Sequence, residues 1–182
     1  MLRRVKTQVT TYYLELLSEE AHTPSRTEAP DLEIRQTGIA AAELSRSLYR
    51  AVGRDWSWTD RLGWPLSKWW AHLERPEVEV WTASLDGVIT GYFELERGYA
   101  ESVEIAYFGV LPQFTGRGIG GCLLSNAVER GFNTGARRVW LHTCSLDSPR
   151  AIDNYQARGF NIFKEETTLE EIPPPPAQED VS

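Results

Sequence analysis

The sequence predicts an α/β (α+β) fold, with a mixed sheet and helices on both of its faces. Segments rich in β-branched and aromatic residues dominate the first part of the chain, and Asp86-Gly87, a dipeptide favoured in type I′ turns, joins two of them. In the C-terminal half, strand-like and helix-like segments alternate. The chain has 182 residues, of which 41% are hydrophobic, and this suffices for one domain with a sizeable core.

The expected strands follow from composition and from turn signals. The early strands are predicted to form an antiparallel meander, with the hairpin at Asp86-Gly87 as its clearest local signal. The strand VEIAYFGVL is mostly apolar, which predicts burial on both faces. In chain order, the expected strands are residues 9–16, 32–37, 78–85, 88–98, 103–111, 137–144 and 160–172.

Four helices are expected between these strands. Apolar residues at helical spacing predict the first, which ends near Gly53. The second starts after Pro65 and contains Trp69 and Trp70, of which only one can point fully inward because they are adjacent. Gly159 is the expected stop of the last helix. The expected helices are residues 39–52, 66–74, 118–132 and 147–159.

Composition limits the class of protein. We expect a single domain over residues 1–172, followed by a flexible, proline-rich tail over 173–182. The net charge of −7 argues against binding to nucleic acid or to an anionic membrane surface. The apolar runs are too short to span a bilayer, and the N-terminus lacks the apolar core of a signal peptide. The two cysteines show no zinc spacing, so a cytoplasmic protein without a metal is expected.

The stretch GVLPQFTGRGIGGCLL places a glycine-rich turn between a strand and a helix. Its glycines let backbone amides approach a ligand, the helix N-terminus favours an anion, and Arg117 adds a positive charge. Such turns also occur for tight packing alone. A dinucleotide-binding interpretation is weaker, because it needs a parallel βαβ unit and an acid about 20 residues further on.

Two spaced motifs resemble the GCN5-related N-acetyltransferase (GNAT) superfamily, and with the order of elements the resemblance covers about residues 5–170. The loop Thr115-Gly116-Arg117-Gly118-Ile119-Gly120 is similar to the family's Q/R-x-x-G-x-G/A loop, with Thr115 in place of Gln or Arg. Ser148 stands where the family commonly has Asn. The family's A-x-x-x-Y-x-x-x-G-F signature is matched by Ala151, Tyr155, Gly159 and Phe160.

The resemblance implies a mostly antiparallel sheet of six to seven strands, splayed between the family's strands 4 and 5, and acetyl-CoA as the cofactor. Backbone N–H groups near Val110, where the family's fourth strand bulges, would polarise the thioester carbonyl. Tyr155 would donate a proton to the leaving thiolate, since a tyrosine with a pKa near 10 stays protonated beside a thiol. The expected cofactor-binding residues are Phe108, Val110, Thr115, Gly116, Arg117, Gly118, Ile119, Gly120, Gly121, Ser148 and Arg150.

Two residues compete for the role of general base. The run from Glu104 to Val110 resembles the E-I-x-F-x-A-V strand of the histone acetyltransferase branch, in which the Glu is the base. A carboxylate in an apolar strand can accept a proton directly or through water. His142, on the next strand, has an intrinsic pKa suited to the same task. Both alternatives remain open at the level of sequence, as does a purely structural role for either residue.

Five of the seven tryptophans lie in residues 56–70, the segment that lines the acceptor side of the cleft in this superfamily. Tyr49, Trp56, Trp58 and Arg61 are the candidate substrate-binding residues, because aromatic rings can hold a cationic or apolar acceptor. We expect the acceptor to be a small-molecule amine. Acetylation of protein lysines or N-termini, and a non-catalytic CoA-binding or sensor domain, are the alternatives. The resemblance leaves a homodimer open.

Overall fold

The computed structural model describes residues 5–27, 29, 31–38, 41–56 and 58–172. The tail of residues 173–182, and residues 39 and 40, at which the first helix is predicted to begin, lie outside the described residues. The elements of the described part are β1 (Val5–Leu16), η1 (Glu19–Ala21), β2 (Leu32–Gln36), α1 (Ala42–Gly53), α2 (Leu66–Leu73), β3 (Val78–Leu85), β4 (Val88–Arg97), β5 (Ser102–Val110), η3 (Pro112–Phe114), α3 (Ile119–Asn133), β6 (Arg138–Cys144), α4 (Ala151–Ala157) and β7 (Asn161–Ile172).

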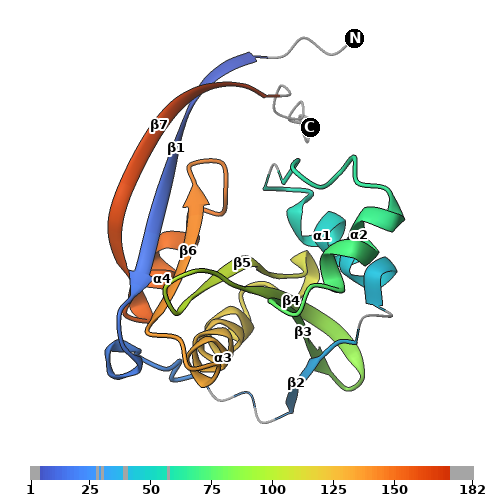
Figure 1. Ribbon diagram of the computed structural model, residues 1–182, viewed down its shortest axis with the longest axis vertical. Helices are drawn as coiled ribbons and strands as arrows, with labels where there is room; N and C mark the ends of the chain where they lie inside the picture. The colour runs from blue at the N-terminus through green and yellow to red at the C-terminus, as the bar shows by residue number, and fades with distance from the viewer. Residues whose placement is uncertain (1–4, 28, 30, 39–40, 57, 173–182) are drawn as a thin grey trace, which may run out of the picture.

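The strands form one open, seven-stranded sheet in the order β2-β3-β4-β5-β6-β1-β7. Only the β5–β6 pair is parallel, so the predicted mostly antiparallel sheet is confirmed. Helix α3 packs on β4, β5 and β6, whereas α1 and α2 cover β3, β4 and β5 from the other face (Figure 1). Each face has its own apolar core, and the predicted helices on both faces are therefore confirmed.

Local turn chemistry explains the elements that the sequence predicts well. Asp86 and Gly87 have φ values of 49° and 76°, the pair of positive angles that a type I′ hairpin requires. Pro65 immediately precedes α2, where its missing N–H costs nothing. In α2, Trp69 is 1% exposed and Trp70 is only partly buried, as their adjacency predicts. None of the helices in the described ranges is long and apolar enough to cross a membrane.

The sheet splays between β5 and β6. These strands pair only over Ser102–Glu104 and Arg138–Trp140, and β5 then continues beside β4 alone. The predicted splay is confirmed. It also corrects the expectation that this strand is buried on both faces: Val103 and Ile105 are buried, but residues 106–110 are only partly covered because the sheet opens beside them.

The first strand is not part of the antiparallel meander, and that prediction was wrong. β1 lies between β6 and β7 and pairs antiparallel with both, far from β2 at the opposite edge of the sheet. This position buries Leu14 and Leu16 in the same core as α3, and from Thr11 onward the strand has hydrogen-bonding neighbours on both edges. Beyond the end of β6, β1 and β7 continue as a curved two-stranded ribbon (Figure 1).

Candidate active site

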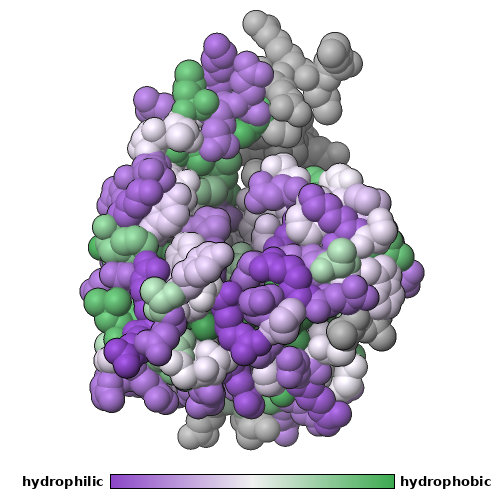
Figure 2. Space-filling view, in the orientation of Figure 1, coloured by the Kyte–Doolittle hydropathy of each residue, from purple (hydrophilic) through white to green (hydrophobic). Residues whose placement is uncertain are grey.

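A cavity of about 580 Å³ lies where β5 and β6 diverge. This volume is typical of small-molecule sites. Its lining comes from β1, the second half of β5, the glycine-rich loop, the end of β6, the start of α4 and the tryptophan-rich segment. Figure 2 shows the surface hollowed between the β1–β7 side and the α1–α2 side of the molecule. Most of the residues predicted to bind cofactor or substrate meet in this one place.

The glycine-rich loop forms one end of the cavity. Some of its positions have no room for a side chain, and others leave the backbone open. A Cβ on Gly118 would lie 2.5 Å from the Cγ2 atom of Thr27, so this glycine is required by packing. At Gly116, which has a φ of 78°, a Cβ would meet nothing within 4 Å. At Gly120 the nearest atom would be 3.8 Å away. Gly116 and Gly120 therefore leave backbone open to a ligand beside the first turn of α3, where helix N–H groups lack intrahelical partners.

The predicted cofactor residues separate into two groups. The side chain of Ile119 is 3% exposed and belongs to the core, and the guanidinium of Arg117 lies over the ring of Phe114, so neither side chain lines the cavity. A cofactor contact through the backbone N–H groups of these two residues stays a prediction. Thr115 donates a hydrogen bond to the carbonyl of Pro112 at 2.8 Å. The predicted residues that line the cavity are Phe108, Val110, Thr115, Gly116, Gly118, Gly120, Gly121, Ser148 and Arg150.

The bulge of the central strand also differs from its predicted position. The register of β4 and β5 shifts between Leu95–Ile105 and Glu94–Tyr107, which leaves Ala106 as the extra residue. Val110, where the bulge was expected, pairs regularly with Gly91. Because the extra residue of a bulge is left out of the ladder, the disrupted backbone lies at Ala106, which lines the cavity.

Tyr155 projects from α4 into the lining of the cavity and is 8% exposed. Its ring packs edge-on against Phe108 and Phe160, with ring centroids 6.2 Å and 6.3 Å away. Burial raises the pKa of Tyr155 above its usual value, and the negative charge of Asp147 adds to the effect. The side chain is therefore a neutral phenol at physiological pH.

The two candidate bases, Glu104 and His142, are in contact with each other. The Nδ1 atom of His142 lies 3.1 Å from Oε1 of Glu104, just beyond the point where the parallel pairing of β5 and β6 ends. His142 lines the cavity, whereas Glu104 is not among its lining residues. The hydrogen bond to Glu104 raises the pKa of His142 above its usual value, although burial opposes the shift. The two candidate bases are therefore joined by one hydrogen bond at the edge of the cavity.

The tryptophan-rich segment provides the opposite wall. Trp56 and Trp58 line the cavity, as predicted from the sequence, and Tyr107 of β5 lies beside them. The indole Nε1–H of Trp58 donates a hydrogen bond to Asp147 across the cavity at 3.3 Å. Carboxylates of Asp60 and Glu170 also belong to the lining.

Tyr49 and Arg61 do not line the cavity, contrary to the prediction. Tyr49 is 1% exposed, and its hydroxyl oxygen accepts the backbone N–H of Arg61 at 3.1 Å. The guanidinium of Arg61 is buried and donates two hydrogen bonds to Glu94, at 2.8 Å and 2.9 Å. It also lies 4.3 Å from the ring centre of Tyr107, so it supports the wall from behind.

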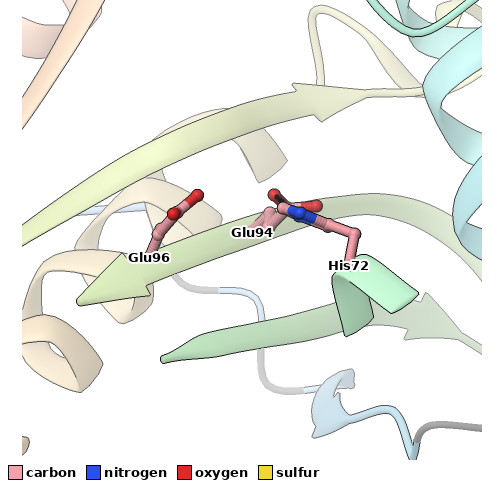
Figure 3. A group of neighbouring side chains, drawn as sticks. All are labelled: His72, Glu94 and Glu96. Carbon is pink, nitrogen blue, oxygen red and sulfur yellow. Dashed lines mark hydrogen bonds and ion pairs between the residues drawn. The ribbon is translucent and has the colours of Figure 1, made fainter. Parts of the chain in front are cut away.

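Glu94, His72 and Glu96 have ligand atoms within 4.8 Å of one another, close enough to suggest a metal site (Figure 3). Each already has a partner. His72 lies 2.9 Å from Glu94, which Arg61 also neutralises, and Glu96 pairs with Arg75 at 2.6 Å. Burial alone would raise the pKa of Glu94, but the bonds from His72 and Arg61 outweigh it and hold the pKa below its usual value. The cluster is therefore a buried ion-pair network of protein groups.

Several lining residues carry no recognisable sequence signal. Thr11 comes from β1, Asp147 from the loop after β6 and Glu170 from β7. They reach the cavity only because β1 inserts beside β6 and β7. The segment of residues 23–27 packs on the N-terminal half of α3, where the backbone N–H of Ser25 donates to Ser125 at 2.8 Å.

Comparisons with known proteins agree on the fold. Residues 41–160 match the model of the "Acetyltransferase (GNAT) family". Over 91 residues the chain is 34% identical to uncharacterised N-acetyltransferases of Mycobacterium bovis and Mycobacterium tuberculosis, a match that covers 50% of this chain and 58% of each relative. The matched region thus spans little more than half the length of these curated relatives.

Solved structures with low sequence identity share the architecture. A GCN5-related N-acetyltransferase from Sphaerobacter thermophilus aligns with a TM-score of 0.67 at 19% identity, covering 95% of this chain and 54% of that one. An aminoglycoside acetyltransferase from an uncultured soil sample aligns with a TM-score of 0.61 at 17% identity, covering 78% of this chain and 95% of that one. At such identities the likeness extends to the fold alone.

Proposed function

The chain belongs to the acetyltransferase (GNAT) family, and on this premise we propose that it transfers an acetyl group from acetyl-CoA to a small primary amine by direct attack in a ternary complex. The observation that carries the proposal is the meeting of the glycine-rich loop, Tyr155 and the Glu104–His142 pair around one cavity. We assign the activity to a single domain of residues 1–172 that acts in the cytoplasm.

The residues around the glycine-rich loop fit acetyl-CoA. The open backbone at Gly116 and Gly120, next to the N-terminus of α3, suits a pyrophosphate. A second cavity of about 490 Å³ adjoins it, with Arg26 and Arg158 in its lining to attract further phosphate charge. Acetyl-CoA supplies the activated thioester, and the cavity's partly apolar lining leaves room for the arm that carries it.

The Glu104–His142 pair would take the proton from the attacking amine. An amine attacks only after it has lost its proton, and a neutral imidazole within the cavity can accept one at Nε2. Glu104 would hold Nδ1 and stabilise the positive charge that His142 then acquires. In this arrangement the imidazole of His142, and not the carboxylate of Glu104, is the group that faces the amine.

Tyr155 would stabilise the departing sulfur by a hydrogen bond. Its raised pKa keeps the phenol protonated, and because a thiol, with a pKa near 8.5, is the stronger acid, the O–H stays on Tyr155 and donates to the negative charge that develops on the thiolate. The packing of its ring on Phe108 and Phe160 fixes the direction of the hydroxyl.

The lining of the acceptor side favours a cationic small amine. Trp56, Trp58 and Tyr107 present aromatic rings, and a cation over such a ring is stabilised by about 0.5–2 kcal/mol. Asp60 and Glu170 add negative charge to the same lining. Charged walls of one sign concentrate ligands of the opposite sign.

The proposal is tested by measuring release of free CoA thiol from acetyl-CoA with a panel of monoamines, diamines, amino sugars and lysine-containing peptides. Turnover is expected with small amines, and most strongly with those that carry a second positive charge. Turnover confined to peptides would favour protein acetylation. Binding of acetyl-CoA without turnover of any amine would contradict the enzymatic proposal and favour a CoA-binding or sensor domain.

A further inference from the structure

We propose that Asp147 is a positioning residue that holds Trp58 across the cavity and so orients the acceptor amine. The role rests on the acetyl transfer proposed above. Asp147 follows β6, on one side of the splayed sheet, and Trp58 belongs to the segment between α1 and α2, on the other. The bond between them joins positions 89 residues apart, and both residues line the cavity.

The carboxylate of Asp147 is fixed by the end of β6. Its Oδ2 atom accepts the hydroxyl of Thr143 at 2.6 Å and the backbone N–H of Cys144 at 3.0 Å. These two donors leave Oδ1 to accept the indole N–H of Trp58 at 3.3 Å. Thr143 is 2% exposed, so its hydroxyl cannot turn away to bond water instead. The carboxylate of Asp147 therefore has a fixed orientation before any ligand binds.

The indole of Trp58 is held just as firmly from its own side. A Cβ on Gly53 would lie 2.5 Å from the Cβ of Trp58, so the absence of a side chain at Gly53 is what admits the ring. The ring centre lies 5.5 Å from that of Tyr49 and 5.1 Å from that of Tyr107. Aromatic packing sets the plane of the indole, and Asp147 accepts its only polar atom.

The bridge connects the two groups of residues that the reaction would use. Trp58 packs on Tyr107 of the acceptor wall, while Asp147 is near enough to Tyr155 for its charge to raise the pKa of that phenol. The hydrogen bond to Asp147 therefore fixes the position of Trp58, and of an acceptor that packs on it, relative to Tyr155. Loss of the bond would leave the indole held by aromatic packing alone and free to shift within its plane, so the acceptor would lose its orientation while cofactor binding is kept.

The test is a double-mutant cycle of Trp58→Phe, Asp147→Asn and the double variant, with steady-state kinetics for the best amine of the panel. Phenylalanine keeps an apolar ring but lacks the N–H. Asparagine keeps the size but has a single oxygen, and when that oxygen accepts the backbone N–H of Cys144, its NH2 group faces the indole N–H and the bond to Trp58 is lost. We expect each single variant to raise the KM for the amine by about 3- to 10-fold, with the KM for acetyl-CoA within about twofold of wild type. The double variant should be no worse than the more affected single variant.

Trp70→Phe is the matched control, because Trp70 is partly buried on α2 and does not line the cavity. It should leave both KM values unchanged. Thermal unfolding of every variant identifies loss of folding, and if one single variant unfolds at the assay temperature, the other tests the role by its separate effects on the two KM values. If the two single effects multiply in the double variant, or if the KM for acetyl-CoA rises with that of the amine, the positioning role is refuted. If the wild type acetylates no amine, the proposed function fails and this role fails with it.

Discussion

Glu94→Gln is the substitution whose effect the structure specifies most fully. The carboxylate is 1% exposed and accepts hydrogen bonds from Arg61 at 2.8 Å and 2.9 Å, with His72 at 2.9 Å. Glutamine has the same shape but no charge, and its amide group would direct N–H donors at the donors of Arg61. The guanidinium would then be a buried charge without a counter-ion, beneath Tyr107 and the tryptophan-rich segment.

The size of the effect follows from burial. Removing one partner of a buried ion pair costs about 3–5 kcal/mol of unfolding free energy. For a domain of this size, about 1 kcal/mol corresponds to about 2–4 °C in Tm, so Tm should fall by about 6–20 °C. The pKa of Glu94 is lowered in the folded state, so its contribution to stability is complete above the unfolded pKa, near 4.3, and is lost as the pH falls through the folded pKa. The difference in unfolding free energy between Glu94→Gln and wild type should therefore become smaller at acidic pH.

The assay is urea unfolding at pH 7 and at pH 3–4, followed by tryptophan fluorescence and far-UV circular dichroism. Glu96→Gln is the control, because Glu96 lies two residues further along β4 and pairs with Arg75 near the surface, with side chains 28% and 44% exposed. Its loss should cost less than about 1 kcal/mol. Two outcomes would refute the conclusion that Glu94 is the buried counter-ion of Arg61: equal destabilisation by the two substitutions, or a loss of less than about 1 kcal/mol for Glu94→Gln.

Three further predictions concern catalysis. Tyr155→Phe should lower kcat by about 10²-fold or more while acetyl-CoA binding, measured by calorimetry, stays within about twofold; an equal loss of binding would make Tyr155 structural. Glu104→Gln should replace the charge-assisted hydrogen bond that raises the pKa of His142 by a weaker, neutral one, so the acidic limb of the pH–rate profile should move to lower pH if His142 takes the proton, and disappear if Glu104 does; an unchanged profile would exclude the pair. Trp56→Ala should raise the KM of a cationic amine by about 2- to 30-fold, the range of a lost cation–π contact, and spare that of acetyl-CoA; a KM unchanged for both substrates would remove Trp56 from the acceptor site.

Local signals in the sequence predict most elements and fail at one pairing. Turn residues such as Asp86-Gly87 act through their own backbone angles, so their effect is visible without the rest of the chain. The alternation of a strand indicates which face is buried but not which neighbour it pairs with. β1 was therefore recognised as a strand and placed beside the wrong partner.

The same distinction applies to the site. The glycine-rich loop and Tyr155 belong to motifs with short, fixed spacing, and these were predictable. Arg61 resembles an exposed charge in an aromatic segment until folding brings Glu94 beside it. Asp147 follows a strand without any local signature, and its partner Trp58 lies far earlier in the chain. Residues whose role depends on a long-range partner were the ones that sequence reasoning missed.

The position of β1 also affects how the molecule is made. β1 pairs with β6 and β7, which are synthesised much later than β1, so both of its edges stay open until those strands have left the ribosome. Pairings between distant segments slow folding, and an unpaired strand with apolar residues such as Val9 and Leu14 is prone to associate with other chains in the meantime. Completion of the sheet, and with it the wall that carries Thr11 and Glu170, is expected to be a late event in folding.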